Sequence, residues 1–309
     1  MLKLPAYVLV TPARNEARFI ESTIQAVVAQ TAIPLKWVIV SDGSTDGTDE
    51  IVQRYAAVHP WIELLRMPER TERNFAGKAH AVNAGLQKAA GLPYEAVANL
   101  DADITFEQDY FAYLLEKLAE DPELGVVGTP NSDASGEVYD FRFVSLEEVQ
   151  GTCQLFRRAC FEAIGGYVPS KGGNIDTIAC VAARMKGWKT RTFTGKLSLH
   201  HRVMGTAQAS PLKARFNEGR RDYIIGNHPV WQLFRVAYQS TKRPFLARGF
   251  ALGAGFLWAA LRRVERPVSS EFIAFRRREE MQRLARFLTG RKQPAATPAP
   301  SRAATSESR

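Results

Sequence analysis

The chain has 309 residues, of which 45% are hydrophobic and 24% are charged. This composition is typical of globular proteins and excludes a disordered or fibrous chain. One large α/β domain with an appendage is expected at this length, because hydrophobic cores stop growing at roughly 250 to 300 residues. The three cysteines, Cys153, Cys160 and Cys180, form no CxxC pair. This spacing argues against a disulfide framework or a cysteine zinc site and predicts buried thiols.

The net charge of +9 is concentrated in the second part of the chain. Residues 1–201 contain 20 Lys and Arg against 25 Asp and Glu, whereas residues 202–309 contain 21 against 7. A basic second part indicates contact with an anionic surface, for which phospholipid and nucleic acid are both candidates. The first residues contain no secretory cleavage site, so the protein is expected to begin in the cytoplasm.

Strands and helices are predicted to alternate along the first half. Short β-branched runs at 6–12 and 36–44 end in turn residues, and the segment 15–30 between them has apolar residues at helical spacing. Further helices are expected at 48–59 and from about residue 77, with a strand at 95–103. This alternation predicts a parallel sheet with helices on both faces. In such sheets the ligand lies beyond the carboxyl ends of the strands.

Six motifs follow one another in the order TPARNE, SDGSTDGT, NFAGKAHAVNAG, NLDAD, CQLFRRACFEAIGGY and NIDTIACVAARMKGWKT. Together they resemble the family 2 glycosyltransferases, of the non-processive type found in bacterial polysaccharide and cell-envelope synthesis. The resemblance covers roughly the first two thirds of the chain. It implies an α/β GT-A fold, with a mixed and mainly parallel sheet that binds a nucleoside-diphosphate sugar.

The resemblance places the donor site in the loops after these strands. Asp101 and Asp103 flank Ala102, and their oxygens suit Mg²⁺ or Mn²⁺, which would neutralise the leaving diphosphate. Asp103 is expected to be the more direct metal ligand. Lys78 follows a glycine at a predicted helix start, where backbone N–H groups and an ammonium meet phosphate. The nucleotide-sugar contacts implied by the resemblance are Thr11, Ala13, Glu16, Asp42, Lys78 and Asp101.

An inverting transfer needs a general base on the acceptor side, and the resemblance assigns that role to Asp176, which stands eleven residues before Gly187. Ile175 occupies the position of a second acid in the family. An ordinary N-cap of the following helix is the alternative explanation of Asp176; the catalytic role is favoured over it, and the two roles can coexist. His200 and His201 are the histidines expected to supply a metal or diphosphate ligand, and strand alternation slightly favours His200.

Residues 129–150 interrupt the α/β pattern, and the resemblance places the acceptor side there. Processive relatives carry a Gln-x-x-Arg-Trp signature and several spanning helices, and neither is evident in this sequence. Transfer of one sugar per acceptor is therefore predicted.

The second part is predicted to be helical, basic and partly apolar. Its apolar segment 245–261 contains an uncharged run of 13 residues from Gly249 to Leu261, shorter than the roughly 20 residues that span a bilayer. Cations bracket this run at Lys242, Arg243, Arg248, Arg262, Arg263 and Arg266. A segment lying in the membrane interface is favoured over a soluble helical cap, and nucleic-acid binding is not expected, because no known module is present.

The sequence thus predicts a catalytic domain at 1–205, a basic helical region at 206–290 and a disordered tail at 291–309. The expected enzyme transfers a sugar from a UDP-sugar to a hydroxyl acceptor, a lipid-linked glycan, on the cytoplasmic face of the plasma membrane. The alternatives are a sugar nucleotidyltransferase, disfavoured because TPARNEARF has no glycine, and an adaptor for membrane or nucleic acid with a decayed site. Intact carboxylates at Asp42, Asp101, Asp103 and Asp176 argue against the adaptor.

Overall fold

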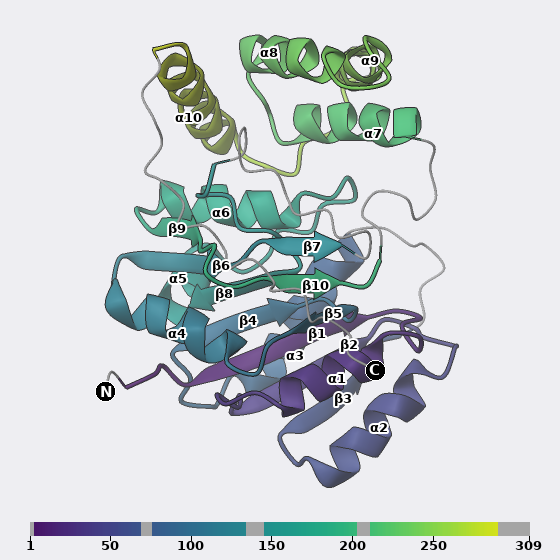
Figure 1. Ribbon diagram of the computed structural model, residues 1–309, viewed down its shortest axis with the longest axis vertical. Helices are drawn as coiled ribbons and strands as arrows, with labels where there is room; N and C mark the ends of the chain where they lie inside the picture. The colour runs from purple at the N-terminus through teal and green to yellow at the C-terminus, as the bar shows by residue number, and fades with distance from the viewer. Residues whose placement is uncertain (1–2, 69–75, 134–144, 203–210, 290–309) are drawn as a thin grey trace, which may run out of the picture.

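The computed structural model describes residues 3–68, 76–133, 145–202 and 211–289. Its centre is a sheet of seven strands in the order β3-β2-β1-β4-β8-β6-β9 (Figure 1). Only β8 runs against its neighbours, so the predicted mixed, mainly parallel sheet is confirmed. The strands are β1 (Tyr7–Ala13), β2 (Lys36–Ser41), β3 (Ile62–Arg66), β4 (Ala96–Leu100), β6 (Leu124–Gly128), β8 (Cys153–Arg157) and β9 (Lys189–Thr192).

Helices cover both faces of this sheet, as the α/β pattern predicts. Alternate residues of a strand point to opposite faces, so Leu9 of β1 packs with α1 (Ile20–Val28), α2 (Thr48–Val58) and α4 (Tyr110–Glu120). Val8 and Val10 pack on the other face. The helices there are α3 (Ala76–Ala89), α5 (Arg158–Ala163) and α6 (Ile175–Met185).

Helix α3 approaches the sheet closely at Gly85. A Cβ atom at this position would lie 2.6 Å from Cγ1 of Val10 and 2.9 Å from Cγ2 of Val40. Glycine therefore permits the short distance between α3 and the strands β1 and β2.

A second, three-stranded sheet brings distant parts of the chain to the end of β4. It has the order β5-β10-β7, formed by β5 (Ile104–Phe106), β10 (Ser198–His200) and β7 (Asn131–Asp133). In the antiparallel pair β5-β10, His200 lies opposite Ile104. This register places His200 next to Asp103, although 97 residues separate them in sequence.

In the described part of the chain, four helices follow β10: α7 (Pro211–Ile224), α8 (Pro229–Ser240), α9 (Ala247–Leu261) and α10 (Ser270–Leu288). Helix α10 packs on α6, where Phe272 contacts the buried cluster that contains Ile178 and Val181. Within the described residues, no helix is both long enough and apolar enough to cross a membrane. The predicted domain limits at 205 and 290, and the tail 291–309, lie outside the described residues.

The three cysteines are free and buried, which confirms the prediction of buried thiols. Burial raises the pKa of Cys153 and of Cys160 to about 12, and raises that of Cys180 as well.

Candidate active site

The predicted site residues gather where β1, β2 and β4 end. Asp42 directly follows β2, and its backbone N–H donates to the carbonyl of Ala13, the last residue of β1 (2.9 Å). Its carboxylate lies 3.8 Å from Nη1 of Arg14. Asp101 follows β4 and donates its N–H to the carbonyl of Thr152 (2.9 Å). The parallel order of β2, β1 and β4 thus brings three loops to one edge of the sheet.

Lys78, in the first turn of α3, joins the end of β4 to the loop before β8. Its ammonium forms an ion pair with Asp101 and donates to the carbonyl of Gly151 at 2.8 Å. Burial raises the pKa of Asp101 above its ordinary value, and the charge of Lys78 only partly offsets this rise. Lys78 is therefore held at the carboxyl end of the sheet, where an anionic ligand would meet it.

The backbone N–H of Gly151 contacts Asp176, the predicted base. This N–H donates to Oδ2 of Asp176 at 3.1 Å, and Asp176 lies in the first turn of α6. One residue of the loop thus links Asp176 to Lys78 and Asp101. The N-cap explanation of Asp176 is wrong, because α6 begins at Ile175 and its N-cap is Asn174, whose side chain makes no capping bond.

Asp103 lies between a histidine and an arginine. Its Oδ2 is 3.2 Å from Nε2 of His200 and 3.2 Å from Nε of Arg202, and Arg202 also forms an ion pair with Glu16. Burial alone would raise the pKa of Asp103, but the hydrogen bond from His200 and the charges of His200 and Arg202 lower it. Asp103 is the carboxylate of this loop that the surroundings keep ionised.

The two histidines face different partners. Burial would lower the pKa of His200, but the hydrogen bond and charge of Asp103 raise it. His201 points elsewhere, since its Nε2 lies 3.0 Å from the hydroxyl of Thr105 and its ring stacks on Phe19. The structure therefore brings His200, and not His201, to the carboxylate of Asp103.

Thr11 and Ala13 are buried in the sheet. The hydroxyl of Thr11 accepts a hydrogen bond from the indole N–H of Trp37 (3.0 Å), and its side chain has no exposed surface. That side chain therefore packs in the core and does not line the site, which corrects the expectation for Thr11. Glu16 remains at the site through its pair with Arg202, and its N–H donates to the hydroxyl of Thr48 (2.8 Å).

The pair Asp103 and His200 offers two ligands to a divalent cation. Nδ1 of His200 is buried and has no hydrogen-bond partner among the described residues. Within the described ranges, no three side chains of His, Cys, Asp or Glu converge on one point. Mg²⁺ is commonly held by one or two carboxylates plus substrate phosphates. The residues present therefore fit a cation that takes its remaining ligands from a diphosphate and water.

Sequence reasoning missed two members of this site. Arg202 is one, and its signal was its position two residues after His200, just beyond the end of β10. Gly151 is the other, and it acts through its backbone, so no side chain could mark it. Half of the predicted acceptor segment 129–150 lies outside the described residues, because the structure omits 134–144.

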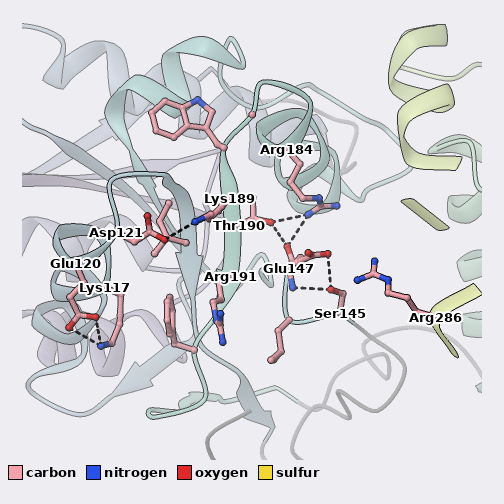
Figure 2. A pocket seen from close by; sticks show the side chains of 15 residues that line it. Lys117, Glu120, Asp121, Ser145, Glu147, Arg184, Lys189, Thr190, Arg191 and Arg286 are labelled. Carbon is pink, nitrogen blue, oxygen red and sulfur yellow. Dashed lines mark hydrogen bonds and ion pairs between the residues drawn. The ribbon is translucent and has the colours of Figure 1, made fainter. Parts of the chain in front are cut away.

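A separate cavity of about 590 Å³ lies between α4, β9 and α10 (Figure 2). Its lining is rich in ion pairs, including Lys117 with Glu120 and Lys189 with Asp121. None of the residues predicted to bind donor or metal, or to act as base, lines it. It is therefore distinct from the site at the ends of β1, β2 and β4.

The sequence that forms much of this site is similar to that of known proteins. Residues 8–144 match the model of the family described as glycosyl transferase family 2. The poly-beta-1,6-N-acetyl-D-glucosamine synthase of Staphylococcus aureus (strain COL) is 32% identical over 137 residues, which are 43% of this chain and 31% of that protein. The chain thus matches about a third of the length of this relative.

Two solved structures share the fold at low sequence identity. The mannosyltransferase PcManGT from Pyrobaculum calidifontis, in complex with GDP-Man and Mn²⁺, has a TM-score of 0.56 at 19% identity, covering 94% of this chain and 89% of its own. GalNAc-T7 with UDP, GalNAc and Mn²⁺ has a TM-score of 0.59 at 16% identity, covering 94% and 58%. Residues 8–144 therefore match a family 2 glycosyltransferase domain, and the chain shares the α/β fold of GT-A structures.

Proposed function

We propose that this chain is an inverting glycosyltransferase that moves a sugar from a nucleoside-diphosphate sugar to a hydroxyl acceptor. The observation that carries the proposal is the double contact of Gly151. Its carbonyl accepts from Lys78, the cation beside Asp101, and its N–H donates to Asp176. A phosphate-binding cation and a candidate base are thereby held on two sides of one residue.

The donor side is supported by charge and by the fold neighbours. Lys78 and Arg202 supply cations, while Asp103 and His200 fit a divalent cation, for which Mn²⁺ and Mg²⁺ are the candidates. When bound, such a cation would stabilise the charge on the leaving diphosphate as a Lewis acid. The neighbours are complexes with GDP-Man and Mn²⁺, and with UDP, GalNAc and Mn²⁺. We favour a UDP-sugar as the donor.

The chemistry assigned to Asp176 is proton removal. The acceptor oxygen forms a bond to the anomeric carbon, while the bond from that carbon to the diphosphate oxygen breaks and its electron pair leaves with the nucleoside diphosphate. Asp176 takes the hydroxyl proton as the acceptor attacks. The N–H of Gly151 fixes one carboxylate oxygen of Asp176 and so orients this group.

The acceptor that we propose is a lipid-linked glycan of polysaccharide or cell-envelope synthesis. The curated relative carries the name of a polysaccharide synthase, and the second part of the chain is basic and partly apolar. Attachment to the cytoplasmic face of the plasma membrane fits such an acceptor. Transfer of a single sugar per acceptor stays a prediction, and isolation of a long polymer made by this chain alone would overturn it.

The test compares Asp176→Asn with the wild type. Release of nucleoside diphosphate from the donor should fall by about 10²- to 10⁴-fold, the usual contribution of a general base. Thermal stabilisation by UDP and Mn²⁺ should be unchanged, because the substitution leaves the donor side intact. Asp109→Asn is the matched control, since Asp109 pairs with Lys196 away from the site. Wild-type turnover in Asp176→Asn would refute the assignment of the base.

A further inference from the structure

Helix α9 is apolar on two opposite sides. One side packs on α7 and α8 through glycines. A Cβ atom at Gly255 would overlap the carbonyl oxygen of Phe216 in α7, and one at Gly249 would lie 2.5 Å from the carbonyl oxygen of Val236 in α8. The other side exposes Phe250 (77%), Leu257 (61%) and Leu261 (84%). A helix that is apolar all round is normally buried in a core or in a membrane.

The exposed side chains form one stripe. Phe250, Leu257 and Leu261 follow one another at intervals of seven and four residues, which places them on the same side of a helix. Phe245 (61% exposed) and Leu246 (73%) precede the helix. We name this surface the α9 patch, formed by Phe245, Leu246, Phe250, Leu257 and Leu261.

Cations flank the α9 patch at both ends. Lys242 and Arg243 precede it, and the exposed Arg262 and Arg263 follow it. The sequence has no Asp or Glu between Asp222 and Glu265. Cations at both ends of an apolar helix are typical of a helix that lies flat in a membrane interface, with its basic side chains at the level of the headgroups.

This charge pattern argues against the other partners. A second copy docked through the same patch would bring like charges together, because no acidic side chain lies in the segment to pair with them. Nucleic acid would meet the cations but would leave the aliphatic stripe uncovered, since base-stacking surfaces need aromatic side chains interleaved with cations. An anionic lipid surface complements both features.

The α9 patch is connected to the candidate base through packed elements. Helix α9 packs on α7 at Gly255, and the carbonyl of Arg221 in α7 accepts from Nδ2 of Asn174 at 3.3 Å. Asn174 lies two residues before Asp176, at the start of α6. Near the C-terminal end of α6, Arg184 forms an ion pair with Glu279 of α10 at 2.7 Å.

We propose that the α9 patch docks on an anionic lipid bilayer and thereby holds Asp176 in a fixed position relative to the membrane. The docking depends only on the helical region. The consequence for catalysis, that the base meets acceptors presented at the bilayer surface, rests on the proposed function.

The test is cosedimentation of the full chain with vesicles of equimolar phosphatidylglycerol and phosphatidylcholine. The double variant Phe250→Ser and Leu257→Ser should bind these vesicles more weakly by on the order of tenfold for each side chain, because each loses the burial of a large apolar group. Val58→Ser is the matched control. Val58 is an apolar side chain with a similar exposed fraction (68%), but it is the last residue of α2, which lies at the opposite end of the molecule (Figure 1).

Charge is tested separately with Arg262→Gln and Arg263→Gln. Each substitution should weaken binding to the anionic vesicles by about fivefold and leave the weak binding to pure phosphatidylcholine unchanged. Equal vesicle binding by the wild type and the double serine variant would overturn the proposal. So would a wild-type dimer that the double variant converts to monomers, because the patch would then be a self-association surface.

The docking and the transfer can fail independently. Asp176→Asn should bind vesicles as the wild type does. The double serine variant should be stabilised by UDP and Mn²⁺ as the wild type is, measured by thermal denaturation, while its binding to vesicles is weakened. Loss of nucleotide binding in that variant would contradict the separation between patch and site.

Discussion

Substitution of Glu148 should weaken the contact between α6 and α10. Oε1 of Glu148 lies 3.1 Å from Nη2 of Arg184 in α6 and 3.1 Å from Nη2 of Arg283 in α10. Burial would raise the pKa of Glu148, but Arg184 and the other nearby arginines lower it from 4.5 to about 2. The ionised carboxylate therefore stabilises the contact between the two helices.

The magnitude follows from this pKa. Each pKa unit corresponds to about 1.36 kcal/mol, so a decrease from 4.5 to about 2 represents on the order of 3 kcal/mol near neutral pH. Glu148→Gln should lower the free energy of unfolding by that order. Because the folded-state pKa is depressed, the contribution is complete above pH 4.5 and is lost as the pH falls through about 2.

The assay is chemical denaturation of the wild type, Glu148→Gln and Glu147→Gln across this pH range. Glu147 is the matched control, since its half-exposed carboxylate lies 3.6 Å from Arg283, and such an exposed pair contributes at most about 1 kcal/mol. The difference between the wild type and Glu148→Gln should narrow as the pH decreases. Equal stabilities of the two variants near neutral pH, or a difference that does not change with pH, would refute the reasoning.

Two further predictions concern the core. Gly85→Ala should destabilise the fold by about 1 to 3 kcal/mol, because its Cβ would lie 2.6 Å from Cγ1 of Val10. Gly91→Ala should not destabilise it, because a Cβ at Gly91 would meet nothing within 4 Å. Thermal denaturation of both variants checks this prediction, and equal melting temperatures would contradict it. The three cysteines should resist a thiolate-selective reagent in the folded protein at mildly alkaline pH, because burial raises their pKa values; rapid labelling before unfolding would show that they are accessible.

The fold could be predicted well from the sequence, because its elements carry local signals. The strand β2 at Lys36–Ser41 and the helix α2 at Thr48–Val58 fall within or close to the ranges expected from β-branched runs and helical spacing. The carboxylates Asp42 and Asp101 could be placed at the sheet edge for the same reason, since each directly follows a strand.

Some contacts between distant segments could not be predicted. Arg202 reaches Glu16 across 186 residues, and no periodicity indicates which acids a surface arginine meets. Gly151 links Asp176 to Lys78 through backbone atoms, which have no signature in a sequence. Thr11 was misplaced because it looks like a polar residue at a strand end, whereas its partner Trp37 lies on the neighbouring strand.

The proposed nucleotide-sugar site at the ends of β1, β2 and β4 is tested most directly by thermal denaturation with nucleoside diphosphates. UDP, GDP and TDP are each added with and without Mn²⁺, since a ligand at about 100 times its dissociation constant stabilises a protein by about 2.7 kcal/mol. We expect one diphosphate to raise the melting temperature only with the metal, and Asp103→Ala to lose this effect. A folded protein that no diphosphate stabilises, with or without metal, would contradict the claim.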